Sequence, residues 1–317
     1  MSDLRPFGRS GLRLSPLSLG GNVFGWSAGE EASFEVLDAY VAAGGNVIDS
    51  ANIYSAWVPG NAGGESETIV GRWIAARGRH DDVVVVTKIG MAGGEQPKGL
   101  TRDLIRQGAE DSLERLGIDR IDLFYAHEDD EGTDLAETMG AFDELVREGL
   151  VTAVAASNYT AERLSEALAV SEREGLVRFE GLQSAYNVLQ RDELEDGALE
   201  VCREEELGVA TYFSLARGFL TGKYHRDGDL PSTPRSVGVQ RDYMNDRGFA
   251  ALEVVERAAE AHDATPAQVS LAWIMAQPGV TCAIASATSA DQARELSGAM
   301  ALALSPEEIG ALDAAGR

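Results

Sequence analysis

Short apolar runs recur along the chain and alternate with amphipathic stretches that follow a helical period. Several of the runs, such as VVVVTK and IDLFYAH, are apolar on both faces, which is typical of buried parallel strands. We therefore expect eight strands, over residues 17–20, 46–49, 83–88, 121–126, 151–156, 179–183, 208–212 and 281–285.

The stretches between the strands carry start and stop signals for helices. Thr101 opens one amphipathic stretch, which Gly117 ends, and Thr160 opens another. A threonine side chain accepts a hydrogen bond from the first backbone N–H groups of a helix, and glycine readily adopts the left-handed conformation that ends one. Pro266 stands in the first turn of a third stretch, where its missing N–H costs little.

This alternation predicts an α/β protein built from right-handed βαβ units with parallel strands. Eight such units in about 300 residues favour a closed (β/α)8 TIM barrel over an open sheet. We expect residues 1–317 to form a single domain. The segments LRPFG and LRLSPL, joined by a turn at 9–11, predict an N-terminal β-hairpin that closes the bottom of the barrel.

The strands are evenly spaced except after the seventh, where residues 216–247 form a long loop with little periodicity. Loops of this length in compact domains are often lids over a binding site. We expect a lid here, with a surface insertion as the alternative.

The chain has 317 residues and a net charge of −25, and an acidic surface of this kind repels nucleic acid and anionic membranes. No apolar run approaches membrane-spanning length, and the first residues lack the apolar segment of a secretory signal. Cys202 and Cys282 are far apart and have no metal-like spacing. We expect a cytoplasmic protein that binds no metal; its oligomeric state is left open.

Titratable side chains follow the ends of successive predicted strands, which in an α/β barrel meet at the rim where active sites lie. Asp49 ends the second strand and Tyr54 follows it five residues later. Lys88 ends the third strand, and His127 follows the fourth. Each residue alone has an ordinary explanation as a cap, a packed ring or a hydrogen-bonded core residue. Four of them at successive strand ends indicate a shared site.

The chemistry of these four side chains is coherent. A phenol has a pKa of about 10 and is a weak acid at neutral pH, but a neighbouring ammonium lowers that pKa by about 1–3 units. Lys88, held by Asp49, would tune Tyr54 to protonate an oxyanion as hydride arrives at carbon, while His127 orients the carbonyl oxygen. The sequence contains no serine nucleophile elbow and no cluster with metal-ligand spacing that would indicate hydrolysis.

At these residues the sequence resembles the aldo-keto reductase superfamily, over nearly the whole chain. NVIDSANIYSAW is similar to the family's Asp-to-Tyr signature, VVVVTKIGM to its lysine strand and IDLFYAHEDD to its histidine strand. GGESETIVGRWI resembles the helix after the catalytic tyrosine. The resemblance implies the barrel fold and reversible reduction of a carbonyl substrate with NADP(H) or NAD(H), with Tyr54 as proton donor in a catalytic tetrad of Asp49, Tyr54, Lys88 and His127.

The resemblance also assigns residues to the cofactor, through VAASNYTAERL, LQSAYNVLQR and LARGFLTGKY. It implies that amides and hydroxyls after the fifth and sixth strands hold the nicotinamide carboxamide, and that an aromatic ring stacks on the nicotinamide. The residues that it places at the cofactor are Gly21, Asn22, Asp49, Ser157, Asn158, Gln183, Tyr212, Phe213, Ser214, Leu215, Arg217, Gly218, Lys223, Ser286, Thr288 and Gln292.

Two cofactor segments depart from the family's pattern. Residues 212–215 read Tyr-Phe-Ser-Leu, where relatives usually read Tyr-Ser-Pro-Leu. Many relatives carry a cation for the 2′-phosphate in the segment that starts at Ser286, whereas this chain has Asp291 there and Leu296 in place of an asparagine. Asp291 disfavours a 2′-phosphate, but the family as a whole favours NADP(H) over NAD(H), and we expect NADP(H).

The substrate class stays open between simple aldehydes, sugars and ketones. Trp26, Trp57 and Phe24 are candidate walls of a pocket near Tyr54, and the carboxylates of EDDEG after His127 either bind sugar hydroxyls or stay hydrated. One alternative function is a cofactor-sensing regulatory subunit, like the potassium-channel β subunits that share the barrel. Another is a lyase or isomerase for phosphorylated substrates, to which the tetrad contributes nothing.

Overall fold

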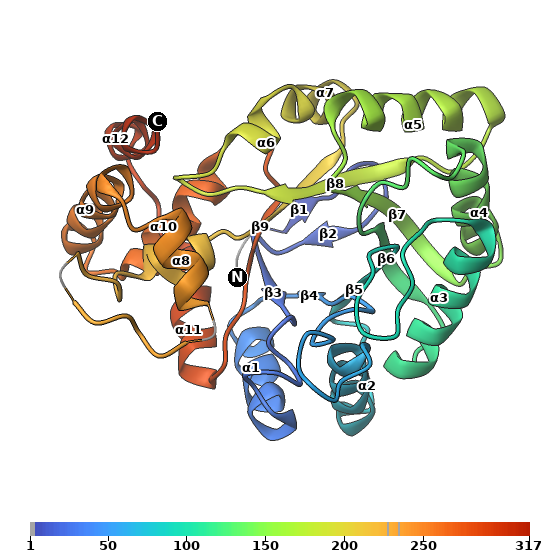
Figure 1. Ribbon diagram of the computed structural model, residues 1–317, viewed down its shortest axis with the longest axis horizontal. Coiled ribbons are helices and arrows are strands. Elements are labelled where there is room, and N and C mark those ends of the chain that lie inside the picture. The colour runs from blue at the N-terminus through green and yellow to red at the C-terminus, as the bar shows by residue number, and fades with distance from the viewer. Residues whose placement is uncertain (1–3, 227, 234) are drawn as a thin grey trace.

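The computed structural model describes residues 4–226, 228–233 and 235–317. Its centre is a closed barrel of eight parallel strands in the order β10-β3-β4-β5-β6-β7-β8-β9 (Figure 1). The barrel strands are β3 (Leu17–Gly20), β4 (Val47–Asp49), β5 (Val84–Ile89), β6 (Ile121–Ala126), β7 (Val151–Ser157), β8 (Phe179–Ala185), β9 (Gly208–Tyr212) and β10 (Cys282–Ala285). The predicted (β/α)8 barrel is confirmed, and each strand starts and ends within two residues of the predicted range.

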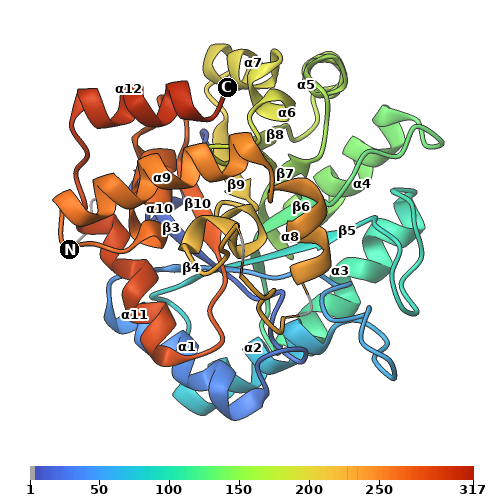
Figure 2. The same cartoon turned by 60° about the vertical axis from the view of Figure 1, so that its left-hand side comes forward.

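Helices cover the outside of the barrel, and Figure 2 shows α9 and α12 running side by side along one flank. Among the described residues no helix is both long and apolar enough to cross a bilayer. The helices are α1 (Glu30–Ala42), α2 (Glu65–Arg77), α3 (Arg102–Leu116), α4 (Leu135–Arg147), α5 (Ala161–Glu174), α6 (Asp192–Glu195), α7 (Ala198–Glu204), α8 (Ser236–Asp242), α9 (Asp246–Ala261), α10 (Pro266–Ala276), α11 (Ala290–Gly298) and α12 (Pro306–Ala315), with 3-10 turns η1 (Ala216–Thr221) and η2 (Ala299–Ala301).

The predicted helix signals are confirmed. The Thr101 side chain accepts a hydrogen bond from the backbone N–H of Leu104 at the start of α3, and Gly117 ends that helix with a left-handed φ of 64°. Thr160 caps α5 in the same way, and Pro266 is the first residue of α10, after a capping box. These caps satisfy N–H groups that a helix cannot satisfy itself, so they fix where each helix begins.

Side chains alternate in direction along each strand, which gives one apolar layer inside the barrel and another between the barrel and the helices. Val84 and Val86 of β5 pack inside the barrel, whereas Val85 and Ile89 pack against the helices. Lys88 continues the inward series toward the carboxyl end of the strand, because successive side chains of a strand point to opposite faces. The barrel interior is therefore apolar at the bottom and charged at the top.

The N-terminal hairpin closes the bottom of the barrel, as predicted. Strands β1 (Arg5–Pro6) and β2 (Arg13–Leu14) pair antiparallel, and the fully buried ring of Phe7 fills the interior. Gly181 and Gly208 make room for this ring, since a Cβ at either position would lie 2.2–2.3 Å from it. The open end is consequently the opposite rim, where the candidate residues lie.

The long segment after β9 is partly helical rather than a plain loop. It contains η1 and α8, and the buried ring of Phe219 packs edge-to-face on Phe249 of α9, outside the segment, with centroids 5.5 Å apart. The predicted loop at 216–247 therefore packs on the molecule through an aromatic anchor. Residues 227 and 234 of this segment lie outside the described residues, and motion of the segment as a lid remains a prediction.

Candidate active site

The four tetrad residues meet at the open rim of the barrel. Asp49 ends β4, Lys88 lies near the end of β5 and His127 directly follows β6, while Tyr54 comes from the turn after β4. The strands are in register here, with Asp49 beside Val86 and Lys88 beside Tyr125. Neighbouring parallel strands thus deliver residues from distant parts of the chain to one point.

Lys88 is the hub of the cluster. Its fully buried ammonium donates to Asp49 Oδ1 at 2.6 Å, to the Tyr54 hydroxyl oxygen at 2.9 Å and to the backbone carbonyl of Ser50 at 2.7 Å. The Tyr54 hydroxyl in turn donates to Asp49 Oδ1 at 3.0 Å. All three N–H donors of the ammonium have acceptors, so the charge is held in one geometry.

Asp49 connects the predicted catalytic cluster to the predicted cofactor residues. Its second oxygen, Oδ2, accepts a hydrogen bond of 2.8 Å from Gln183 Nε2 at the end of β8. A buried carboxylate is stable only when it is paired and hydrogen-bonded, and here Lys88 and Gln183 supply both conditions. Gln183 therefore links β8 across the barrel to the tetrad.

The electrostatics of Tyr54 differ from the sequence-based expectation. Burial raises the pKa of Tyr54 well above its ordinary value, and the adjacent Asp49 raises it further. The expected lowering by Lys88 is thus wrong for the protein alone, because desolvation and a carboxylate outweigh one ammonium whose own pKa burial lowers. The consequence is a phenol that keeps its proton at neutral pH and has it available to donate.

His127 faces Tyr54 across the site, with ring centroids 6.1 Å apart in an edge-to-face arrangement. Burial, and then the positive charge of Lys88, holds the pKa of His127 well below its ordinary value. Its backbone is fixed by a bond to the Ile89 carbonyl at 2.7 Å and by the Asn158 side-chain amide at 2.8 Å. A neutral imidazole in this position can donate one hydrogen bond to a carbonyl oxygen.

The residues predicted to hold the nicotinamide carboxamide lie next to His127. Asn158 adopts a left-handed φ of 60°, and its amide contacts both the Ser157 hydroxyl and the His127 carbonyl. The Tyr212 hydroxyl donates to Asn158 Oδ1 at 2.7 Å, so β7 and β9 meet here. Amide and hydroxyl groups beside a partly exposed ring suit a flat amide-bearing heterocycle.

The segment after β9 gathers the predicted phosphate-binding groups. The backbone turns tightly, with positive φ at Phe213, Ala216, Arg217 and Gly218, and a Cβ at Gly218 would lie 3.2 Å from Lys223 Nζ. The Arg217 guanidinium stacks on the Phe213 ring at 4.6 Å. Its Nε is buried and has no hydrogen-bond partner among the described residues, while its Nη1 lies 3.7 Å from Asp242 Oδ2.

Ser214 and Leu215 of the same segment face inward instead. The buried Ser214 hydroxyl donates to the Thr211 carbonyl at 3.1 Å, and Leu215 packs against the apolar core. Their side chains support the turn, so any cofactor contact they make would come from their backbone.

Sequence analysis missed Arg235. This arginine lies just before α8, and its guanidinium stacks on the Trp26 ring at 5.5 Å. Burial lowers its pKa and Arg217 lowers it further, because two guanidinium groups repel. Among residues 4–226, 228–233 and 235–317 no carboxylate pairs with it. The sequence did offer one signal for Arg235: it is a cation in the long segment without periodicity after β9, where cofactor residues were predicted.

The predicted adenosine residues form a small polar cluster between β10 and α11. The Ser286 hydroxyl donates to Asn22 Oδ1 at 2.6 Å, and Gln292 Oε1 accepts bonds from the backbone and hydroxyl of Thr288. Gly21, which follows β3, lies beside this cluster and donates its backbone N–H to the Asp49 carbonyl. Asp291 is paired at 2.6 Å with Arg294, a second cation that sequence analysis missed.

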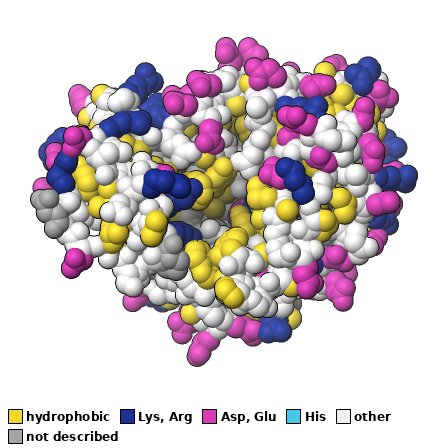
Figure 3. All heavy atoms as spheres, viewed as in Figure 1, with side chains coloured by type: hydrophobic (Ala, Val, Ile, Leu, Met, Phe, Trp, Pro, Cys, Tyr) yellow, Lys and Arg dark blue, Asp and Glu magenta, His cyan; other side chains and the backbone are white. Residues whose placement is uncertain are grey.

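Two of the three expected wall residues border the site. Trp57 is 48 % exposed, packs edge-on to Trp26 with centroids 5.5 Å apart and lies 6.3 Å from the Tyr54 ring. Phe24 is fully buried in the core and does not contribute a wall. Figure 3 shows a hollow near the middle of this face, ringed by hydrophobic side chains and with Lys or Arg side chains at its edge.

Three of the four carboxylates after His127, those of residues 128–130, have protein partners. Glu128 pairs with Lys98 at 3.0 Å, and Asp129 pairs with Arg163 at 2.9 Å. Asp130 accepts bonds from three groups of neighbouring loops, and the hydroxyl of Thr133 is the main cause of its lowered pKa. These side chains hold the loop in place, which argues against binding of sugar hydroxyls.

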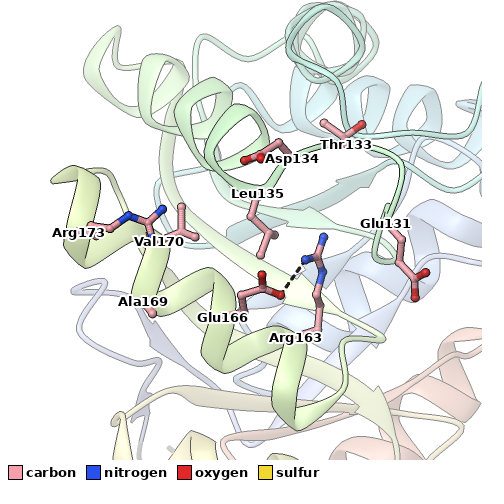
Figure 4. Close-up of a pocket in the computed structure, with 9 residues that line it drawn as sticks. All are labelled: Glu131, Thr133, Asp134, Leu135, Arg163, Glu166, Ala169, Val170 and Arg173. Carbon is pink, nitrogen blue, oxygen red and sulfur yellow. Dashed lines mark hydrogen bonds and ion pairs between the residues drawn. The ribbon is translucent and has the colours of Figure 1, made fainter.

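A groove of about 490 Å³ lies on the outer surface between α4 and α5 (Figure 4). Arg163 and Glu166, one turn apart on α5, pair along one wall of the groove at 2.9 Å. None of the predicted catalytic or cofactor residues lines it, so it is separate from the site at the rim.

Comparison with known proteins agrees with this geometry. The profile of the Aldo/keto reductase family matches residues 16–317. Aldo-keto reductase str7 of Strobilurus tenacellus is 33 % identical, over 96 % of this chain and 86 % of its own. A probable voltage-gated potassium channel subunit beta of Arabidopsis thaliana is 32 % identical over 91 % and 88 %, and the uncharacterized oxidoreductase YrpG of Bacillus subtilis is 33 % identical over 95 % and 91 %. With the closed barrel, these matches show that the chain belongs to the aldo/keto reductase family, and its reductase and oxidoreductase relatives support a carbonyl-reducing oxidoreductase.

Proposed function

We propose that this protein reversibly reduces an aldehyde or ketone to the alcohol with NAD(P)H, with Tyr54 as the proton donor. It would act in the cytoplasm, as a single domain, on a small carbonyl or alcohol substrate. The observation that carries the proposal is the Lys88 ammonium, which lies within hydrogen-bond distance of both Asp49 and the Tyr54 hydroxyl at the open rim. A purely structural role would not explain this arrangement, because burying charge is costly.

A bound reduced nicotinamide would supply the hydride. Tyr54 keeps its proton because its pKa is raised, and its hydroxyl turns from Asp49 toward the substrate oxygen as negative charge develops there. Lys88, which remains within 2.9 Å of the Tyr54 oxygen, then compensates the phenolate. His127, held neutral, donates a second hydrogen bond that orients the carbonyl.

We propose that the cofactor lies along the rim from Tyr212 to the β10–α11 cluster. Gln183, Asn158 and Ser157 would hold the carboxamide, and Tyr212 would stack on the nicotinamide ring. Arg217, Lys223 and Arg235 would neutralise phosphates, which is consistent with the unpartnered Nε of Arg217. The remaining assigned groups, Gly21, Asn22, Ser286, Thr288 and Gln292, would contact the adenosine half.

NADP(H) is our preferred cofactor over NAD(H). The argument from Asp291 against a 2′-phosphate weakens, because Arg294 neutralises that carboxylate at 2.6 Å. Arg235 adds a cation without a carboxylate partner among the described residues. A phosphate bound beside Arg217 and Arg235 would relieve the repulsion between them.

The test is oxidation of NADPH and of NADH by the purified protein, in parallel, with aromatic aldehydes, sugars and diketones. Turnover that requires a carbonyl and disappears in Tyr54→Phe supports the proposal. Turnover retained in that variant rules out Tyr54 as the acid. The ratio of rates with the two cofactors tests the preference for NADP(H).

The second candidate is a cofactor-sensing regulatory subunit, which the similarity to probable potassium channel β subunits favours. The same assay separates the two. If both cofactors quench protein fluorescence and no carbonyl oxidises either of them, the regulatory-subunit function would be favoured.

A further inference from the structure

The first turn of α2 lies behind the catalytic strand ends and carries polar side chains that are fully buried. Ser66 and Glu67 are both 0 % exposed, although the helix faces the outside of the barrel. A buried carboxylate outside the catalytic cluster is costly unless a specific arrangement requires it. The partners of these two residues show what that arrangement is.

Ser66 ties the ends of two strands together. Its hydroxyl donates to the Gly21 carbonyl at 2.8 Å and accepts from the Ser50 hydroxyl at 2.9 Å. The Ser50 carbonyl is itself an acceptor for Lys88 Nζ. The close approach explains Gly21, since a Cβ there would lie 2.7 Å from Ser66 Oγ.

Glu67 ties the next strand, β5, to the next helix, α3. Its Oε1 accepts from the Thr87 hydroxyl, on the outward side of β5 next to Lys88. Its Oε2 accepts from Arg115 Nε of α3 at 2.6 Å. Gly64 is needed for this contact, because a Cβ there would lie 2.4 Å from the Arg115 side chain. The carboxylate thus lies between the catalytic strand and an outer cation.

We propose that Glu67 is a positioning residue for the reduction: its buried carboxylate fixes the end of β5 and provides the negative charge behind that strand which keeps Lys88 an ammonium beside Tyr54. Lys88 then faces charge on both sides of its strand, with Asp49 inside the barrel and Glu67 outside. The kinetic part of this proposal depends on the proposed function, whereas the protonation of Lys88 does not.

The charge balance around Lys88 supports this role. Burial lowers the pKa of Lys88, Asp49 opposes that effect most strongly, and Glu67 also raises it. Arg115, 20 % exposed, bonds to the oxygen of Glu67 that points away from β5. The charged or titratable groups around Lys88 are Asp49 from β4, Tyr54 from the turn after β4, Tyr125 of β6, His127 after β6, Cys282 of β10 beside Asp49, and Glu67 from α2.

The chain allows this to be measured directly, because Lys88 is one of only three lysines, with Lys98 and Lys223. In protein labelled with 15N-lysine, Lys98→Arg and Lys223→Arg assign the other two Nζ signals and leave that of Lys88. We expect Glu67→Gln to lower the pH at which Lys88 loses its proton by about one unit. In the same variant kcat falls and its alkaline limb moves to lower pH, while KM for the cofactor is unchanged.

Matched control variants distinguish an effect of the Glu67 charge from an effect on folding. Glu65→Gln removes a carboxylate from the same helical turn that bonds only to the backbone of residues 62 and 63, and should leave the Lys88 titration unchanged. Glu67→Asp keeps the charge and should restore most of the titration midpoint. Glu67→Gln/Arg115→Gln serves if the single variant does not fold. An unchanged Lys88 midpoint in the Glu67→Gln variants overturns the proposal. Absence of carbonyl turnover by the parent protein refutes only the proposed function.

Discussion

The rim at β4, β5 and β6, which we propose is catalytic, and the proposed cofactor segments after β9 and β10 are built in opposite ways. At the rim, Asp49, Tyr54 and Lys88 satisfy one another; Asp49 and Lys88 are buried, and Tyr54 is half-buried. After β9, Arg217 and Arg235 repel each other, and Arg217 Nε lacks a partner among the described residues. One region satisfies its own charges, whereas in the other Arg217 has only a loose pair with Asp242 at 3.7 Å, and Arg235 has no carboxylate partner among the described residues.

This difference has an energetic consequence. Groups that already satisfy one another resist change, and removing one partner leaves the other buried and uncompensated. Groups that repel are stabilised only when a ligand arrives, so their removal costs binding rather than folding.

Replacing Tyr54 with phenylalanine removes the proton donor and one acceptor of Lys88 but keeps the ring that packs against Trp57. We expect kcat to fall by about 10²–10⁴-fold, the contribution of a positioned acid. Cofactor affinity, measured by fluorescence titration, should change little. A fall in affinity as large as the fall in kcat would show that Tyr54 mainly supports the cofactor.

Replacing Lys88 with methionine leaves Asp49 buried without its cation. Loss of one partner of a buried pair costs about 3–5 kcal/mol, which urea denaturation would measure as a lower free energy of unfolding. The double variant Lys88→Met/Asp49→Asn should recover a large part of this loss, because no uncompensated charge remains. Equal instability of the single and double variants would mean that packing, not charge, limits the cluster.

Replacing Arg235 with alanine should weaken cofactor binding without reducing the stability of the fold. We expect the dissociation constant for NADPH to rise roughly 10- to 100-fold, since a charge-assisted hydrogen bond contributes about 1.5–3 kcal/mol. Without cofactor, the variant should be as stable as the parent or more so, because the repulsion from Arg217 is gone. Arg226→Ala is the control, as Arg226 is in the same segment and already pairs with Asp246.

The pH dependence of stability offers a smaller test at His127. Its folded-state pKa lies well below the ordinary value, so the unfolded chain binds this proton first as pH falls. The associated stability is fully present above about pH 6.5 and decreases below it by about 1 kcal/mol per pH unit. Thermal or urea unfolding from pH 7.5 to 5 should show a shallower loss in His127→Gln. An equal slope in both proteins would contradict a neutral, buried imidazole.

Sequence alone predicted the barrel and the residues at its rim because both follow from local pattern. Apolar runs fixed the strands, and Asp49, Lys88 and His127 stand at strand ends that parallel pairing must bring together. The pKa direction of Tyr54 could not be predicted in this way. Proximity to Lys88 is visible in the sequence, whereas the competing burial and the hydrogen bond to Asp49 exist only in three dimensions.

The cofactor segments were less predictable for a related reason. Arg235 comes from a stretch without periodicity, and its contact with Trp26 joins residues more than 200 positions apart. The loop after His127 suggested a sugar site because its carboxylates looked free, but Lys98 and Arg163 occupy two of them. Charges in sequence therefore show what is present, and only packing shows which of them are available to a ligand.

The smallest effect is expected at the exposed pair of Asp291 and Arg294. Surface pairs contribute about 0.2–1 kcal/mol, so neither Asp291→Ala nor Arg294→Ala should change stability measurably. Their effects on cofactor choice should be opposite. Removing Asp291 frees a cation near Thr288 and Gln292 and should raise the NADPH-to-NADH ratio of kcat/KM, whereas removing Arg294 should lower it, each by less than about fivefold. Changes of the same sign in both variants would place the 2′-phosphate elsewhere, with Arg217 and Arg235 as the remaining cations to test.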